Sequence, residues 1–236
     1  VVSYGADLGR GFELKAYVRP SGKNPTDLLF HDMFDTEVRS LFGQYSVDLS
    51  DVTELSIEAR YDRESRSVDN LVPPVAAALY YGGGDPINPA MASVGDTIDS
   101  RSTTFDQFQP KFSITTNAGN TSYYASYGYG FRSGGFNSTG SAATTDFWLN
   151  SGNPFGLGVV GAGISVNDEF DKEVSRAFEV GFKGTYLDGR LAMNGAYFNT
   201  NVTDNQFFEF FAGPWGLLRV VTTIDELDIS GYELDF

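Results

Sequence analysis

The feature that most constrains this chain is a two-residue alternation of apolar and polar side chains, which recurs in segments of roughly ten residues. In residues 54–63, for example, Leu55 and Ile57 fall at one parity and Glu58 and Arg60 at the other. Successive side chains of a β-strand point to opposite faces, so each such segment predicts a strand with one apolar and one polar face. The same pattern occurs at 107–116, 122–132, 173–187, 190–198 and 232–236, and more weakly at 11–18, 41–49 and 216–224. The sequence therefore predicts an all-β chain of roughly eight or nine antiparallel strands.

The connections between these segments alternate between short and long. Residues 50–51, 117–120 and 188–189 are tight hairpin turns, whereas about 66–104 and about 133–172 are long connections. Loops of that length count against a compact soluble domain. Short turns alternating with long loops are typical of an up-and-down transmembrane β-barrel, whose short turns face the periplasm and whose long loops face the exterior.

Composition narrows the classes of function. No run of apolar residues is long enough for a transmembrane helix, which leaves a β-barrel open because its strands barely raise the mean hydropathy. The net charge of −15 argues against a nucleic-acid partner. With no cysteine, with His31 as the sole histidine and without a nucleophile or phosphate-binding motif, we expect no enzyme, no cofactor and no metal site. The carboxylates at 168–171 lack the register of a calcium loop, and we interpret them as a solvated acidic loop.

Several ordered motifs carry a family resemblance. The run at 123–137, YYASYGYGFRSGGFN, resembles a signature of TonB-dependent receptors in which a barrel strand leads into an extracellular loop. Similar runs precede and follow it in the expected order: FGQY at 42–45 with DLSD at 48–51, ARYDRE at 59–64, EVGFK at 179–183 with LDGRL at 187–191, and GYEL at 231–234. The resemblance covers about 38–236 and is specific as a combination.

Membership of that family implies a larger barrel, of roughly 22 strands, plugged by an N-terminal domain. The chain is then expected to be one partial barrel domain, 1–236, an internal fragment without the plug and its TonB-contacting segment. The implied function is active import of a scarce solute across the bacterial outer membrane. Ferric siderophores, cobalamin and oligosaccharides are the implied cargo classes. The implied partners are outer-membrane lipid, a small-molecule or metal-chelate ligand, and the TonB complex acting through the missing plug.

Candidate ligand contacts lie on the polar strand face and in the long loops. Arg132 ends the polar face of 122–132, and Gly128 and Gly130 on that face either make room for a plug or let neighbouring side chains pack. Loop residues that could contact a ligand are Asn137, Tyr80, Tyr81, Trp148 and Trp215, although loop aromatics more often anchor loop packing.

Two other interpretations remain open from the sequence. The first is a small autonomous barrel, either a passive porin or a structural protein of the outer membrane. The second is a soluble β-sandwich that binds carbohydrate, which would require the apolar strand faces to be covered by a second sheet.

Overall fold

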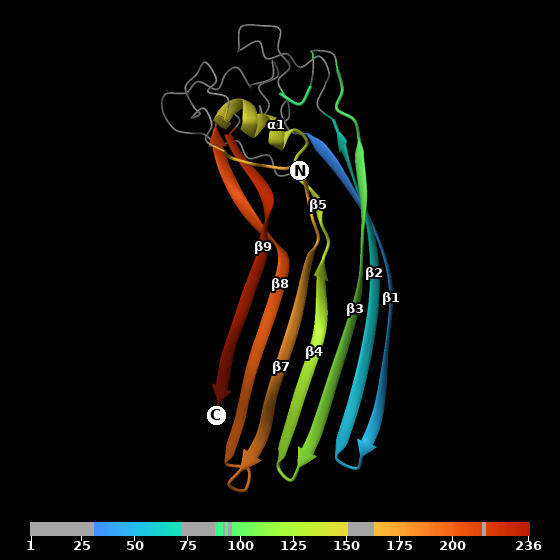
Figure 1. Cartoon of the computed structure of the whole chain (residues 1–236), viewed down its shortest axis with the longest axis vertical. Helices are drawn as coiled ribbons and strands as arrows, with labels where there is room; N and C mark the ends of the chain where they lie inside the picture. The colour runs from blue at the N-terminus through green and yellow to red at the C-terminus, as the bar shows by residue number, and fades with distance from the viewer. Residues whose placement is uncertain (1–30, 72–87, 92, 94–95, 151–162, 214–215) are drawn as a thin grey trace.

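The computed structural model describes residues 31–71, 88–91, 93, 96–150, 163–213 and 216–236, and they form one large antiparallel sheet. Its seven strands follow one another in chain order, each paired with its predecessor (Figure 1). They are β1 (Asp32–Ser50), β2 (Thr53–Asn70), β3 (Arg101–Ala118), β4 (Thr121–Arg132), β7 (Glu173–Tyr186), β8 (Leu191–Gly213) and β9 (Gly216–Asp235). Because every pair is antiparallel and sequential, this is the predicted up-and-down topology.

Three short turns lie at one end of the sheet, which we call the turn end. They connect β1 to β2 at Asp51–Val52, β3 to β4 at Gly119–Asn120, and β7 to β8 at 187–190, as the sequence predicts. Gly119, Gly189, Leu187 and Asp188 have positive φ, which hairpin turns of this kind require. The long connections leave from the opposite, loop end.

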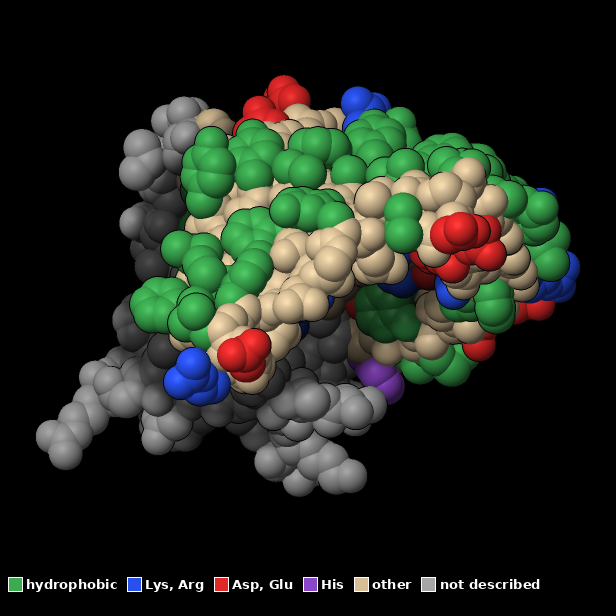
Figure 2. All heavy atoms as spheres, turned by 90° about the horizontal axis from the view of Figure 1, so that it is seen from below, with side chains coloured by type: hydrophobic (Ala, Val, Ile, Leu, Met, Phe, Trp, Pro, Cys, Tyr) green, Lys and Arg blue, Asp and Glu red, His purple; other side chains and the backbone are tan. Residues whose placement is uncertain are grey.

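The two parities of each strand separate onto two faces of a curved sheet. In register, Leu55 of β2 pairs with Ile114 of β3, which pairs with Ala125 of β4, and that apolar row continues through Val180 to Tyr197. Seen from the turn end, hydrophobic side chains lie mainly along the convex border (Figure 2). The concave face, which we call the trough, carries the polar parity, including Ser56, Glu58 and Lys111.

The convex apolar face is exposed. Leu41 is 77% exposed, Phe108 55% and Tyr232 86%. A soluble sandwich would cover such residues with a second sheet, and the described residues contain only this sheet and a two-stranded ladder. The convex face is therefore built to contact lipid.

The apolar face has a nearly constant height when it is measured from the turn end. It runs from Thr53 to Tyr61 in β2, from Tyr186 to Phe178 in β7, and from Leu191 to Tyr197 in β8. These intervals of seven to nine residues correspond to roughly 23–30 Å of strand. A strand tilt of about 40° reduces them to roughly 18–23 Å of height, close to the apolar band of an outer-membrane barrel. No helix within the described ranges is long and apolar enough to cross a membrane.

Most of the buried apolar side chains gather near the loop end. Val68, Phe105, Leu218 and Val220 are buried there, together with Met91 from the long connection after β2. Beside them lie the ladder of β5 (Gly135–Phe136) with β6 (Glu169–Phe170), the one-turn helix α1 (Ser141–Thr145) and a π-helical turn, Asp146–Asn150. The sheet thus has a small packed cluster of loop and strand residues at its loop end, above the curved strands.

The observed strands differ from the expected ones in length and number. The segments 216–224 and 232–236 are not separate strands, because β9 runs through both and pairs with β8 throughout. β8 likewise continues past 198 to Gly213, so β8 and β9 extend beyond the apolar band and form a tight hairpin at the loop end. The weak candidate at 41–49 is the middle of β1, whereas 11–18 lies outside the described residues.

Candidate ligand-facing site at the loop end

The trough face is organised by an acidic residue at the height where the apolar band ends. Asp62 of β2 is 5% exposed and accepts hydrogen bonds from Arg60 Nε at 2.6 Å, from Gln109 Nε2 at 2.5 Å and from the Ser40 hydroxyl. These partners come from three adjacent strands, so the carboxylate links β1, β2 and β3. With all its partners on the wall, Asp62 is a structural node of the trough.

Arg132 lies at the loop end of β4 on the same trough face, as the alternation predicts. Its neighbour in register, Glu173, accepts from Asn205 Nδ2 at 3.0 Å and from the Gln206 backbone N–H at 2.8 Å instead. Arg132 is exposed and makes no hydrogen bond or ion pair with any described residue. It is therefore a cation on the trough wall without a partner among the described residues.

The trough-facing glycines of β4 are explained by their neighbours. A Cβ on Gly130 would lie 2.5 Å from Ser175 Oγ, and one on Gly128 would lie 3.0 Å from Lys111 Cγ. Side chains of β3 and β7 already occupy the space above these two residues. The structure thus favours the packing interpretation of the small residues over that of a vacancy for a plug.

The loop after β4 crosses from one edge of the sheet to the other. Asn137 is 4% exposed, and its Nδ2 donates to the Val221 carbonyl on β9 at 2.9 Å and to the Asn167 carbonyl at 2.7 Å. Its Oδ1 accepts from the Val221 N–H at 2.7 Å. Two residues further on, the Thr139 N–H donates to Asp32 Oδ2 on β1 at 2.9 Å. Because β1 and β9 are the two edges of the sheet, this loop, residues 133–145, spans the mouth of the trough (Figure 1).

Three glycines allow this loop to pack closely. A Cβ on Gly134 would collide with the Phe105 ring and the Phe170 carbonyl, and one on Gly135 would lie 3.0 Å from the Phe170 ring. Gly140 has a φ of +85°, and a Cβ there would collide with the Asn88 carboxamide. The run of small residues is therefore a steric requirement of the crossing.

Asp168 fixes the part of this loop at residues 140–142 by accepting hydrogen bonds from its backbone. Its carboxylate accepts from the backbone N–H groups of Ala142 at 2.8 Å and Gly140 at 3.2 Å, and it lies 4.0 Å from Arg101 Nη1. These acceptors stabilise the single turn of α1, which the sequence analysis expected to be loop. Asp168 is thus a tertiary acceptor rather than part of a solvated acidic loop. Sequence alone gives no signal for it, because its donors are 26 and 28 residues away along the chain.

The structure describes the remaining candidate ligand contacts only in part. Tyr80, Tyr81 and Trp215 lie outside the described residues. Trp148 belongs to the π-helical turn that follows α1, so its backbone comes directly after the loop over the trough mouth. Asn137 is brought to the same loop, but its amide is already bonded to backbone groups, and a direct contact with ligand remains a prediction for it.

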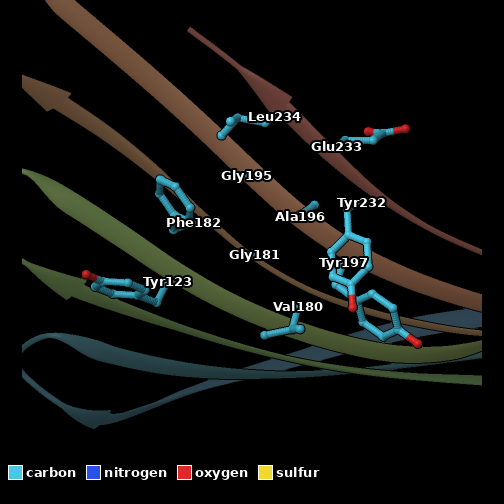
Figure 3. A pocket seen from close by; sticks show the side chains of 10 residues that line it. All are labelled: Tyr123, Val180, Gly181, Phe182, Gly195, Ala196, Tyr197, Tyr232, Glu233 and Leu234. Carbon is cyan, nitrogen blue, oxygen red and sulfur yellow. The ribbon is translucent and has the colours of Figure 1, made fainter.

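An apolar hollow of the described surface lies away from this mouth. It measures about 460 Å³ and lies over Gly195 on β8, between Tyr123, Phe182 and Tyr232 (Figure 3). These residues belong to the convex, lipid-facing parity, so the hollow opens toward the membrane rather than into the trough. Within the described ranges no three metal-ligating side chains converge.

Comparison with known proteins identifies the architecture. The family described as "TonB dependent receptor-like, beta-barrel" matches residues 2–236. No curated protein sequence matches the chain. Among solved structures, the ferric yersiniabactin uptake receptor FyuA from Yersinia pestis superposes with a TM-score of 0.53 at 16% identity, over 86% of this chain and 24% of the receptor. The copper transporter OprC superposes with a TM-score of 0.51 at 19% identity, over 84% of this chain and 26% of the transporter.

These matches settle the class of protein. The chain spans about a quarter of the length of the two solved structures, and the likeness shows a shared fold. The family consists of outer-membrane transport proteins rather than enzymes. The convex apolar band, the up-and-down strands and the loop over the trough mouth agree with that assignment, and the chain belongs to the TonB-dependent receptor family as part of its β-barrel in the bacterial outer membrane.

Proposed function

We propose that this chain supplies wall and ligand-capturing loops to a receptor that imports a scarce solute too large for passive pores. The observation that carries the proposal is the loop 133–145, which is bonded to both edge strands and holds α1 over the trough mouth. A solute entering the trough would pass this loop and then meet the free cation of Arg132 on the wall. A fixed loop over the entrance binds with a smaller loss of conformational entropy than a mobile one would.

The cargo we favour is a metal chelate or another solute that bears at least one anionic group. Arg132 offers a planar fork of donors that suits carboxylate or phosphate oxygens. Energy for import would come from the TonB complex, acting through a plug domain. A neutral oligosaccharide or cobalamin remains the alternative cargo, which the loop tyrosines and tryptophans would contact by stacking.

The test is uptake by the full-length receptor in cells, with a panel of ferric siderophores, cobalamin and oligosaccharides. We expect import of one anionic chelate, lost when the proton-motive force is collapsed. Energy-independent import of many small solutes would instead establish the passive porin.

Arg132→Gln tests the role of the trough cation. Loss of one charge-assisted hydrogen bond is expected to weaken binding of the imported ligand about tenfold or more. Arg63→Gln is the matched control, because Arg63 lies on the convex face and should leave ligand affinity unchanged. Equal affinity in wild type and Arg132→Gln would remove Arg132 from the binding site, without bearing on energy-dependent import.

A further inference from the structure

In the part of the sheet that the structure describes, the outward-facing arginines of the strands lie at one height. In β1, Arg39 is the first outward residue past Leu41, where the continuous apolar row ends, and Arg63 holds the equivalent position past Tyr61 in β2. Arg176 does so past Phe178 in β7. In the described parts of the wall below the loops, the other strand cations face the trough: Arg60, Arg66, Arg101, Lys111, Arg132 and Lys183. The three outward arginines therefore form a belt along the loop-side border of the apolar band.

These arginines are poorly neutralised by the protein. Arg39 and Arg63 face each other directly across the β1–β2 pair, an arrangement of like charges that costs stability. Arg39 is bonded to Glu37 at 2.7 Å, but its side chain is 76% exposed. Arg63 has no ion pair or hydrogen bond with any described residue, and the nearby Asp106 accepts from the Tyr61 hydroxyl at 3.2 Å.

Arg176 has a different environment from the other two. It is exposed, and its described contact is the face of the Tyr129 ring, whose centroid lies 5.8 Å from the guanidinium carbon. A cation over an aromatic ring at a membrane border keeps its N–H donors directed outward. It can therefore bind an anion without breaking an ion pair.

We propose that this belt, Arg39, Arg63 and Arg176, binds the phosphate groups of lipids in the leaflet on the loop side of the membrane. The position supports a lipid rather than a soluble anion, because the belt begins where the lipid-facing apolar residues end, at the level of lipid headgroups. Arginine binds phosphate oxygens through paired N–H donors. The chain as a whole has a net charge of −15 and would otherwise repel an anionic leaflet, so the three cations lie where they can offset that repulsion.

The experiment measures binding of lipid A that bears two phosphates to the full-length receptor in a neutral detergent. Wild type is expected to bind it in preference to lipid A from which the phosphates have been removed. Replacing each arginine by glutamine should weaken binding about fivefold, and the triple change Arg39→Gln, Arg63→Gln, Arg176→Gln should weaken it about a hundredfold. The matched control is Arg190→Gln at the turn end, where the side chain donates to the Leu187 carbonyl. Its affinity should equal that of wild type.

Two measurements keep the outcome decisive. A shift in electrophoretic mobility on heating reports whether each variant is folded. The wild-type affinity itself should fall as salt rises, because an exposed phosphate–arginine contact is screened. Salt-independent binding, equal affinity for dephosphorylated lipid A, or a folded triple variant that binds like wild type would each overturn the proposal. None of these outcomes depends on the imported solute.

Discussion

The loop crossing makes a quantitative prediction for Asn137→Ala. The substitution removes three hydrogen bonds, two to Val221 and one to the Asn167 carbonyl, from a side chain that is 4% exposed. In an antiparallel strand the N–H and C=O of one residue point to the same side. Both groups of Val221 are bonded to Asn137, so they point away from β8, and the amide occupies the position of a further strand at this place on the edge of β9.

The magnitude follows from the number of bonds. Each hydrogen bond contributes a net stabilisation of about 1 kcal/mol, and a buried group left without a partner costs more. Val221 is half-buried, so water can replace part of the lost hydrogen bonding. The value of about 1 kcal/mol per bond therefore applies, without the larger cost of a fully buried unpaired group. We expect Asn137→Ala to weaken loop docking by about 3 kcal/mol, which corresponds to an opening on the order of a hundredfold more frequent.

Hydrogen exchange of the full-length receptor in detergent measures this opening. The Val221 amide should exchange on the order of a hundredfold faster in Asn137→Ala, while amides in the middle of β2 remain unchanged. The matched control is Asn150→Ala, because Asn150 makes the same two-way amide contact, here with Ile164, at 2.8 and 3.2 Å. Asn150→Ala should speed hydrogen exchange of the Ile164 amide and leave the Val221 amide protected. Unaltered protection of Val221 in Asn137→Ala would refute the edge-capping argument.

Two further substitutions test the packing. Gly134→Ala should destabilise the loop by about 2 kcal/mol or more, because the new methyl group collides with Phe105, whereas Gly43→Ala, with open space around it, should be neutral; protease resistance of the loop distinguishes them. Asp62→Ala should lower the urea midpoint of the refolded barrel by an amount equivalent to about 1–2 kcal/mol, because it removes the shared acceptor of Arg60, Gln109 and Ser40, whose exposed or half-buried donors can then partly bond to water. An unchanged midpoint would show that Asp62 is not a structural node.

The topology was predictable because it depends on local patterns. Alternation in β2, β3, β4 and β7 and the turn residues at Gly119 and Gly189 are readable within a few positions of the sequence, and the structure confirms each of them. Strand length was less predictable. β8 and β9 continue as a hairpin past the apolar band, and outside lipid neither strand face must be apolar. The alternation that marks a strand fades there, and β9 was consequently predicted as two pieces.

The loop could not be predicted for a different physical reason. Its structure depends on contacts between residues far apart in sequence, such as Asn137 with Val221 and Thr139 with Asp32. No periodic pattern encodes such pairs. The segment 138–145, rich in serine and threonine, belongs to the long connection predicted at about 133–172, yet Ser141, Thr144 and Thr145 are fully buried where the loop lies over the trough. Predicting that burial requires knowing that β1 and β9 form the two edges that the loop connects.

The family motif at 123–137 contains residues that fix the loop and one residue, Arg132, that does not. Three of its residues, Gly134, Gly135 and Asn137, are each accounted for by a steric or hydrogen-bonding demand of the crossing. A motif set by such demands identifies the architecture, and it would persist whatever solute the receptor imports. Arg132 differs, because the described structure gives its charge no partner. Within the motif, Arg132 is therefore the residue whose replacement should change ligand affinity while the loop stays docked, and Asn137 is the residue whose replacement should release the loop.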